Sequence, residues 1–225
     1  MGRVKLRGKS YRAVIFDFDG VLADSVEVKT KAFEAVFEEW GKEIQQQVVT
    51  HHRHHGGMTR TEKFLFYYRH YLNLELDREG LASLCERFSA LVVEKVIASP
   101  EIVGAEDFLK SCRDQDIICY VDSATPDDEL KRIVKARNWE PYFREILGSG
   151  KSKQANLEWI LETYGYNTAD CLFFGDASSD YGAAVGCGVD FIGILPDKEA
   201  PLLKKYPHIH WANDFKQIME GKLYG

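Results

Sequence analysis

The sequence predicts an α/β protein, with a Rossmann-like parallel sheet, helices on both faces of that sheet and an inserted helical domain. Over residues 100–225, short apolar runs alternate with segments of helical spacing, which is typical of βαβ units. An earlier apolar run, 13–18, is separated from them by an interval far longer than one crossover needs. That interval is helical in pattern, so the simplest arrangement is a helical domain inserted after the first strand.

Each element of the predicted core follows from its residue pattern. Apolar runs of strand length predict parallel core strands at 13–18, 117–122, 171–175 and 189–195, and a shorter one at 145–147. Helical spacing predicts helices at 105–113, 127–137, 154–164 and 178–185. The alternation of the two patterns favours a parallel sheet covered on both faces.

The inserted region is predicted to contain three helices, at 29–40, 61–71 and 78–96. The first places Phe33 and Phe37 on one apolar face and is expected to end at Gly41. Pro100 and Gly104 mark the return to the core. The expected boundaries are 25–99 for the inserted domain, and 1–24 together with 100–225 for the core.

Composition favours a cytoplasmic protein of ordinary globular type. The 225 residues suffice for one core and a smaller inserted unit, and 45% are hydrophobic and 28% charged. The net charge of −6 argues against a general nucleic-acid binder, and no stretch is long and apolar enough to span a membrane. Residues 1–10 lack the apolar core of a signal peptide, and the five cysteines form no C-x-x-C pair, so reduced thiols are expected.

Two acids, Asp17 and Asp19, stand where the first strand should end, and Gly20 turns the chain away. Ligands of open α/β sheets usually bind at the carboxyl ends of the strands. One carboxylate at such an edge can attack a substrate and the other can move a proton. The alternative interpretation is a pair of solvated acids at a strand end.

The segment Asp17-Phe18-Asp19-Gly20-Val21 resembles the first motif of the haloacid dehalogenase-like hydrolases, most of which are Mg²⁺-dependent phosphatases. The resemblance covers nearly the whole chain except the inserted region, whose position is similar to that of the helical cap in the phosphatase and phosphomutase branch. It implies that Asp17 is the nucleophile, which forms an aspartyl-phosphate, and that Asp19 is the general acid and base. It also implies that Mg²⁺ contacts a carboxylate oxygen of Asp17 and the backbone carbonyl of Asp19.

Two further acids, Asp176 and Asp180, are expected to complete the metal site. Asp176 leaves the strand 171–175, and Asp180 follows about one helical turn later, so both can face one cation. Asp176 is the stronger candidate ligand, whereas Asp180 acts through water or by orienting Asp176. The alternative is that Asp176 only caps the next helix.

Phosphate binding is assigned by the same resemblance to Ser123, at the end of the strand 117–122, and to a lysine. Alternatively, Ser123 or Thr125 only opens the helix that begins near Pro126. Lys153, at the start of the helix 154–164, is the favoured lysine and Lys151 is the fallback. The surrounding Gly-Ser-Gly-Lys-Ser is not a nucleotide-binding P-loop, because Glu145 occupies the position that needs the first glycine.

The segment 51–64 of the inserted region gathers four histidines and several basic residues around a Gly-Gly turn. We expect it to contact an anionic substrate through His55, Arg60 and Lys63, with Arg60 and Lys63 one turn apart and acting on one anion. A metal site that includes His51 and His55 is an alternative, as is a solvated helix end.

These features predict a Mg²⁺-dependent phosphatase that hydrolyses a phosphate monoester of a small metabolite. The expected partner is therefore a small phosphorylated metabolite. A phosphomutase of the same branch would share every core residue, and a catalytically silent binding protein would keep the fold. Cleavage of a carbon–halogen bond is disfavoured because it does not need the Mg²⁺ carboxylates. Cleavage of a carbon–phosphorus bond would need a Schiff-base lysine such as Lys29 or Lys63. The sequence gives no indication of the oligomeric state.

Overall fold

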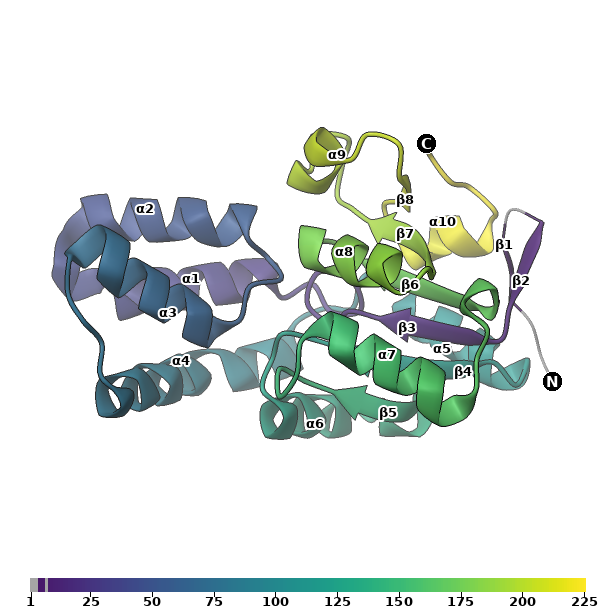
Figure 1. The fold of residues 1–225 in the computed structure, drawn as a ribbon, viewed down its shortest axis with the longest axis horizontal. Coiled ribbons are helices and arrows are strands. Elements are labelled where there is room, and N and C mark those ends of the chain that lie inside the picture. The colour runs from purple at the N-terminus through teal and green to yellow at the C-terminus, as the bar shows by residue number, and fades with distance from the viewer. Residues whose placement is uncertain (1–3, 7) are drawn as a thin grey trace.

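The protein is seen in a computed structural model that describes residues 4–6 and 8–225. Its centre is a six-stranded parallel sheet in the order β5-β4-β3-β6-β7-β8 (Figure 1). The strands are β3 Ala13–Phe16, β4 Ile118–Asp122, β5 Phe143–Leu147, β6 Cys171–Gly175, β7 Asp190–Ile194 and β8 His210–Ala212. A separate antiparallel hairpin pairs β1 Val4–Leu6 with β2 Lys9–Tyr11.

Helices cover both faces of this sheet. They are α5 Ala105–Asp114, α6 Asp127–Ala136, α7 Lys153–Tyr164, α8 Ser178–Gly186, α9 Pro201–Lys205 and α10 Phe215–Met219, with 3₁₀ turns at Glu140–Tyr142 and Thr168–Asp170. All of β3 is buried, because Val14 and Phe16 belong to the apolar cluster with α5 and α10, and Ala13 and Ile15 to the cluster with α7 and α8. The continuous apolar run of β3 is therefore the pattern of a strand buried on both sides.

The first four α-helices after β3 form a helical insert, which lies beside the sheet at the left of Figure 1. They are α1 Val26–Val36, α2 Gly41–His54, α3 Arg60–Tyr67 and α4 Arg78–Ala98, with a 3₁₀ turn at Glu38–Trp40 and a π turn at Tyr68–Leu72. Phe33 of α1 holds them together, since its ring lies 5.5 Å from that of Phe64 in α3 and 4.4 Å from that of Phe88 in α4.

The chain enters and leaves the insert at one place, a neck formed by residues 22–24 and 100–102. The backbone N–H of Asp24 donates to the carbonyl of Pro100 at 2.9 Å, and that of Ile102 donates to Leu22 at 3.0 Å. Between them Ala23 pairs with Glu101 as an isolated antiparallel bridge. Both connections therefore reach the insert side by side.

The predicted fold class is confirmed, and the differences lie in particular elements. The helix expected at 29–40 is α1 followed by a 3₁₀ turn, and Gly41, at φ +83°, ends that turn and is the first residue of α2. The sequence analysis did not predict α2, α9, α10, β8 or the hairpin. Among the described helices, none has both the length and the apolar character needed to cross a membrane. The expectation for residues 1–10 falls partly on residues 1–3 and 7, which lie outside the described residues.

Candidate active site

Three polar residues follow three neighbouring strands of the sheet. Asp17 follows β3, Ser123 follows β4 and Asp176 follows β6. The registers pair Phe16 with Val121 on one side and with Phe174 on the other, so the three strands end at the same level. β3 is also the point where the strand order changes direction, which is where parallel sheets form ligand crevices.

Asp17 is buried and carries its charge against a lysine. The Nζ atom of Lys153, at the start of α7, lies 2.8 Å from Asp17 Oδ1. Burial raises the pKa of Asp17 to about 6, and the charges of Asp180 and Asp19 also raise it, although Lys153 opposes the shift. The acids in turn raise the pKa of Lys153 despite its burial. Lys153 is therefore a fixed positive charge beside the carboxylate.

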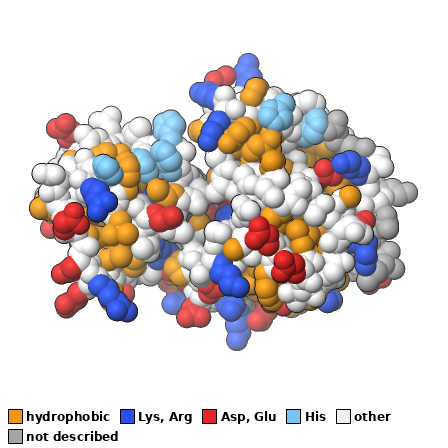
Figure 2. All heavy atoms as spheres, in the orientation of Figure 1, with side chains coloured by type: hydrophobic (Ala, Val, Ile, Leu, Met, Phe, Trp, Pro, Cys, Tyr) orange, Lys and Arg blue, Asp and Glu red, His pale blue; other side chains and the backbone are white. Residues whose placement is uncertain are grey.

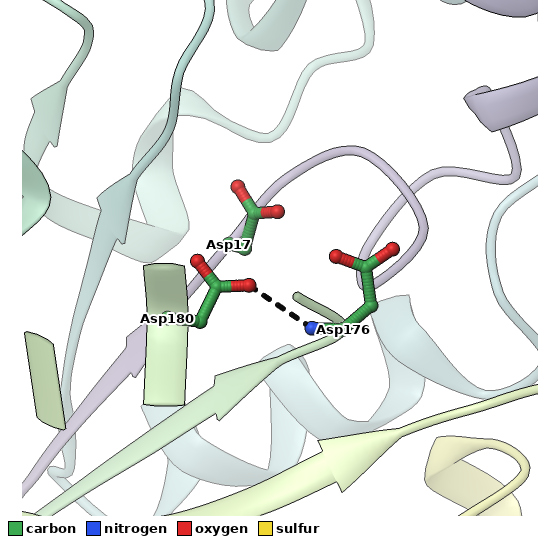
Figure 3. Close-up of side chains that lie close together, drawn as sticks. All are labelled: Asp17, Asp176 and Asp180. Atoms are coloured by element: carbon green, nitrogen blue, oxygen red, sulfur yellow. Dashed lines mark hydrogen bonds between the residues drawn. The ribbon is translucent and has the colours of Figure 1, made fainter. Parts of the chain in front are cut away.

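Asp180 is fully buried and already has partners for both of its oxygens. Oδ2 accepts a hydrogen bond from the backbone N–H of Asp176 at 3.1 Å (Figure 3). It accepts a second from the backbone N–H of Ala177 at 3.0 Å. Oδ1 accepts from Lys153 at 2.5 Å. Asp180 thus fixes the backbone of Asp176 and the ammonium of Lys153, and its geometry is that of an orienting residue.

The three acids form a cluster that suits a hard cation. Figure 3 shows Asp17, Asp176 and Asp180 approaching from three different elements, and one oxygen of each lies within 4.8 Å of the others. Burial raises the pKa of Asp176 well above its usual range, and the charges of Asp17 and Asp180 add to the shift. A divalent cation would offset this accumulated negative charge, and carboxylate oxygens are the ligands that Mg²⁺ prefers. The donor set therefore fits Mg²⁺.

The carboxylate of Asp19 points away from that cluster and toward the helical insert. Oδ1 accepts from Ser25 Oγ at 2.6 Å, and Oδ2 accepts from Thr125 Oγ1 at 3.1 Å and from the ammonium of Lys29 in α1. Burial raises the pKa of Asp19, but the charge and hydrogen bonds of these partners outweigh burial, and the net shift is downward. Of the predicted metal ligands, Asp19 is thus the one whose side chain lies outside the acid cluster.

The two candidate phosphate lysines differ in position. Lys153 contacts Asp17, whereas Lys151 is exposed and no contact described for this chain joins it to a carboxylate of the site. Ser123 is buried, and its Oγ accepts the backbone N–H of Thr125 at 3.2 Å. The geometry brings Ser123 and Lys153 to the predicted site and leaves Lys151 at the surface.

A cavity of about 1000 Å³ lies over the strand ends and is closed from the other side by the insert. Its core wall includes Asp17, Ser123 and Asp176, and its insert wall includes His52, Arg60 and Lys63. In Figure 2, His side chains lie at the surface of both parts of the molecule, on the insert at the left and on the upper part of the core at the right. The volume is that of a small-molecule site.

The loop between α2 and α3 lines the cavity and lies close to the core. A Cβ atom on Gly57 would overlap the side chain of Ser179 in the core. Gly20, at φ +82°, is similarly restricted, since a Cβ there would overlap the carboxylate of Asp176. Glycine at both positions lets main chain approach the site closely.

The predicted substrate residues all line the cavity, but each of them has a different partner. Arg60 donates to Glu129 of α6 through both terminal nitrogens, at 3.0 and 2.5 Å. Lys63 instead contacts His52, and His55 is exposed and stacks on His51 with 3.9 Å between ring centroids. The expectation that Arg60 and Lys63 share one anion is therefore not what the geometry shows, because Glu129 neutralises Arg60.

Sequence reasoning missed the partners of these residues. Thr125 was considered only as a helix opener, Lys29 only as a Schiff-base candidate, and Glu129 was not singled out. Lys29 stands ten positions after Asp19, a spacing that gives no helical or strand relation between them. Only the fold brings them together.

The sheet and the acid cluster together define an α/β enzyme with its site at the carboxyl edge of a parallel sheet. A model of the haloacid dehalogenase-like hydrolase family matches residues 11–188, so the chain belongs to that family of hydrolases. The predicted family and the prediction that the chain is an enzyme are confirmed.

Relatives of known name support this assignment. The chain is 26% identical to a phosphoglycolate phosphatase of Pseudomonas putida, over 81% of this chain and 69% of the relative. It is 24% identical to a phosphorylated carbohydrates phosphatase of Thermotoga maritima, over 93% and 90%. Its fold is similar to that of a β-phosphoglucomutase of Clostridium difficile, with a TM-score of 0.74, 18% identity and coverage of 94% and 96%.

Proposed function

We propose that this protein is a Mg²⁺-dependent phosphatase, which hydrolyses the phosphate monoester of a small metabolite through a phosphorylated Asp17. The observation that carries the proposal is the position of Asp17, 2.8 Å from Lys153 and grouped with the Asp176 carboxylate at adjoining strand ends. A nucleophilic carboxylate beside a fixed cation is what attack on a dianionic phosphoryl group requires.

In the first step, a carboxylate oxygen of Asp17 attacks phosphorus in line with the ester bond. The phosphorus–oxygen ester bond breaks, and Asp19 gives its proton to the leaving oxygen, which becomes the alcohol product. The Ser123 hydroxyl and the Lys153 ammonium hold the phosphoryl oxygens during this transfer.

In the second step, water attacks the phosphorus of the aspartyl-phosphate and Asp19 accepts its proton. Inorganic phosphate leaves and Asp17 returns to its starting form, so one ester and one water give one alcohol and one phosphate. The contact with Lys29 favours the ionised form of Asp19. That form is the one the second step needs.

The cation site of the proposal consists of Asp17 and Asp176, with Asp180 orienting Asp176. When bound, Mg²⁺ supplies positive charge that offsets the negative charge of the transferring group. We further propose that residues 25–99 act as a cap on a core formed by 1–24 and 100–225. A closed cap excludes bulk water from the site and strengthens its electrostatic interactions.

The names of the relatives suggest two classes of substrate. The Pseudomonas relative points to a phosphorylated hydroxy acid and the Thermotoga relative to a phosphorylated sugar. We propose a substrate from one of these classes.

Release of free phosphate from a panel of phosphorylated metabolites, with Mg²⁺ and with EDTA, tests the proposal. Mg²⁺-dependent release from a subset of the panel is expected. Transfer of the phosphoryl group to a sugar phosphate without net release would identify a phosphomutase. Binding of these compounds with neither release nor transfer would identify a silent binding protein.

A further inference from the structure

A buried lysine in the insert wall has no acidic partner. Only three Lys or Arg side chains in the described part of the chain are buried, Arg60, Lys63 and Lys153. Two of them have carboxylate partners, Glu129 for Arg60, and Asp17 with Asp180 for Lys153. No ion pair is found for Lys63 among the described residues, although only 1% of the residue is exposed.

The partner of Lys63 is instead a histidine. Its Nζ atom lies 2.7 Å from Nδ1 of His52 in α2, and it also lies 5.4 Å from the ring centre of Phe33. An ammonium group can donate hydrogen bonds but cannot accept them. Nδ1 of His52 therefore accepts this hydrogen bond, and His52 stays neutral. Burial, followed by the charge of Lys63, lowers the pKa of His52 to about 2. His52 therefore orients the ammonium without neutralising it.

The charge on Lys63 is costly for the protein as it stands. Burial and the nearby charge of Lys29 lower its pKa to about 7, although Asp176, Asp19 and Glu62 oppose the shift. A buried charge without a counter-charge is stabilised only when an opposite charge arrives. The cavity that Lys63 lines also contains Asp17 and Ser123, so a ligand held there can supply that charge.

The number of unpaired positive charges on the insert wall indicates which ligand group would match them. Four Lys and Arg side chains of the insert line the cavity, and three of them have a carboxylate partner, which is Asp19 for Lys29, Glu27 for Arg53 and Glu129 for Arg60. Lys63 is the fourth. One positive charge on the insert wall is left for the ligand, which matches a carboxylate better than a second dianionic phosphoryl group.

We propose that Lys63, oriented by His52, is a specificity-determining residue that binds a carboxylate of the substrate. The inference rests on the proposed phosphatase function and narrows its substrate class to phosphate monoesters of small hydroxy acids. The phosphoryl group lies at the core wall and the carboxylate at the insert wall. A phosphorylated sugar offers only neutral hydroxyls to Lys63 and leaves its charge unmatched.

The test compares phosphate esters that differ in the carboxylate alone. The pairs are 3-phosphoglycerate with glycerol 1-phosphate, and 2-phosphoglycolate with ethyl phosphate. We expect wild-type kcat/KM to favour the carboxylated member of at least one pair by about 10- to 100-fold, the range of a hydrogen bond to a charged group. Lys63→Met should remove that preference through KM, with the neutral ester changed less than about threefold. Lys63→Arg should retain part of it.

Lys31→Met, which removes an exposed lysine from α1, is the matched control and should leave the preference unchanged. Equal kcat/KM for both members of each pair in the wild type, or a Lys63→Met variant that loses both activities equally, would overturn the carboxylate proposal. Preference for a bisphosphate over both members would also overturn it. The wild-type ratios decide the matter even if Lys63→Met does not fold. Absence of phosphate release from these esters and from the whole panel of phosphorylated metabolites would refute the phosphatase function itself.

Discussion

The two walls of the cavity hold their charges in opposite ways. On the core wall, Asp17 and Asp176 are carboxylates grouped at strand ends, and Lys153 contacts Asp17. On the insert wall, Arg60 is neutralised by Glu129 and Lys63 has only a neutral histidine. The core wall thus concentrates negative charge at the place proposed for chemistry. The insert wall leaves the positive charge of Lys63 without a carboxylate partner, so that a ligand can pair with it.

Removal of the proposed nucleophile, Asp17, should have the largest effect. Asp17→Asn keeps the size of the side chain but cannot form the aspartyl-phosphate, so phosphate release should fall by about 10⁴-fold or more. Asp128→Asn, on the exposed side of α6, is the control and should keep full activity. Residual activity within tenfold of wild type in Asp17→Asn would show that the core wall is not the site of attack.

Removal of the ion pair between Arg60 of the insert and Glu129 of the core should lower the stability of the protein. Arg60→Met leaves Glu129 buried without its counter-charge, so the free energy of unfolding should fall by about 3 kcal/mol in urea denaturation. Arg87→Met breaks an exposed pair with Glu39 and should cost about 0.5 kcal/mol or less. Equal losses in the two variants would mean that the Arg60 pair is no more than a surface contact.

The pH dependence of substrate preference should distinguish the titration of Lys63 on the insert wall from titration on the core wall. Lys63 binds a carboxylate in its ammonium form, which the free enzyme loses as pH rises through about 7. The ratio of kcat/KM for a carboxylated ester to that for its neutral partner should therefore fall above pH 7, by up to about tenfold per unit. Burial and the charge of Lys29 lower this pKa, the charges of Asp176, Asp19 and Glu62 raise it, and His52 contacts the Nζ atom. Titration on the core wall affects both esters and cancels in the ratio, so a ratio independent of pH contradicts the role of Lys63.

The smallest effect concerns the stability cost of Lys63. Its pKa is about 7 in the folded protein and 10.5 in a model peptide, so the unfolded chain binds more protons between these pH values. Wild-type stability should consequently rise with pH across that window. Lys63→Met should remove this rise and be about 1 kcal/mol more stable at pH 7. Thermal unfolding of both proteins, with Lys31→Met as control, measures it, and a less stable Lys63→Met variant would assign the residue a structural role.

Much of the core could be predicted because its information is local. The apolar runs of β3 and β6 and the acids directly after them lie within a few residues of each other, and strand ends of a parallel sheet meet at one edge. α2 was not predicted because its apolar positions are few. Its Val48 and His52 are buried only through packing against the rest of the insert.

The side-chain contacts of the candidate site could not be predicted either, because they too depend on packing between distant segments. Glu129 is separated from Arg60 by 69 positions, and no local pattern marks it as a partner. His52 was noticed only as part of a histidine cluster. Which of these side chains turns toward the cavity depends on how the insert packs on the core, and that is a property of the fold.

The paired neck at residues 22–24 and 100–102 has an evolutionary consequence. Because the chain departs and returns through adjacent hydrogen-bonded segments, the sheet receives the same two ends whatever lies between them. Substitutions within the insert can alter which molecules are accepted while the carboxylates at the strand ends keep their positions. A lineage could therefore acquire new substrates by exchanging this one segment, and grafting it onto a related core would transfer the preference with it.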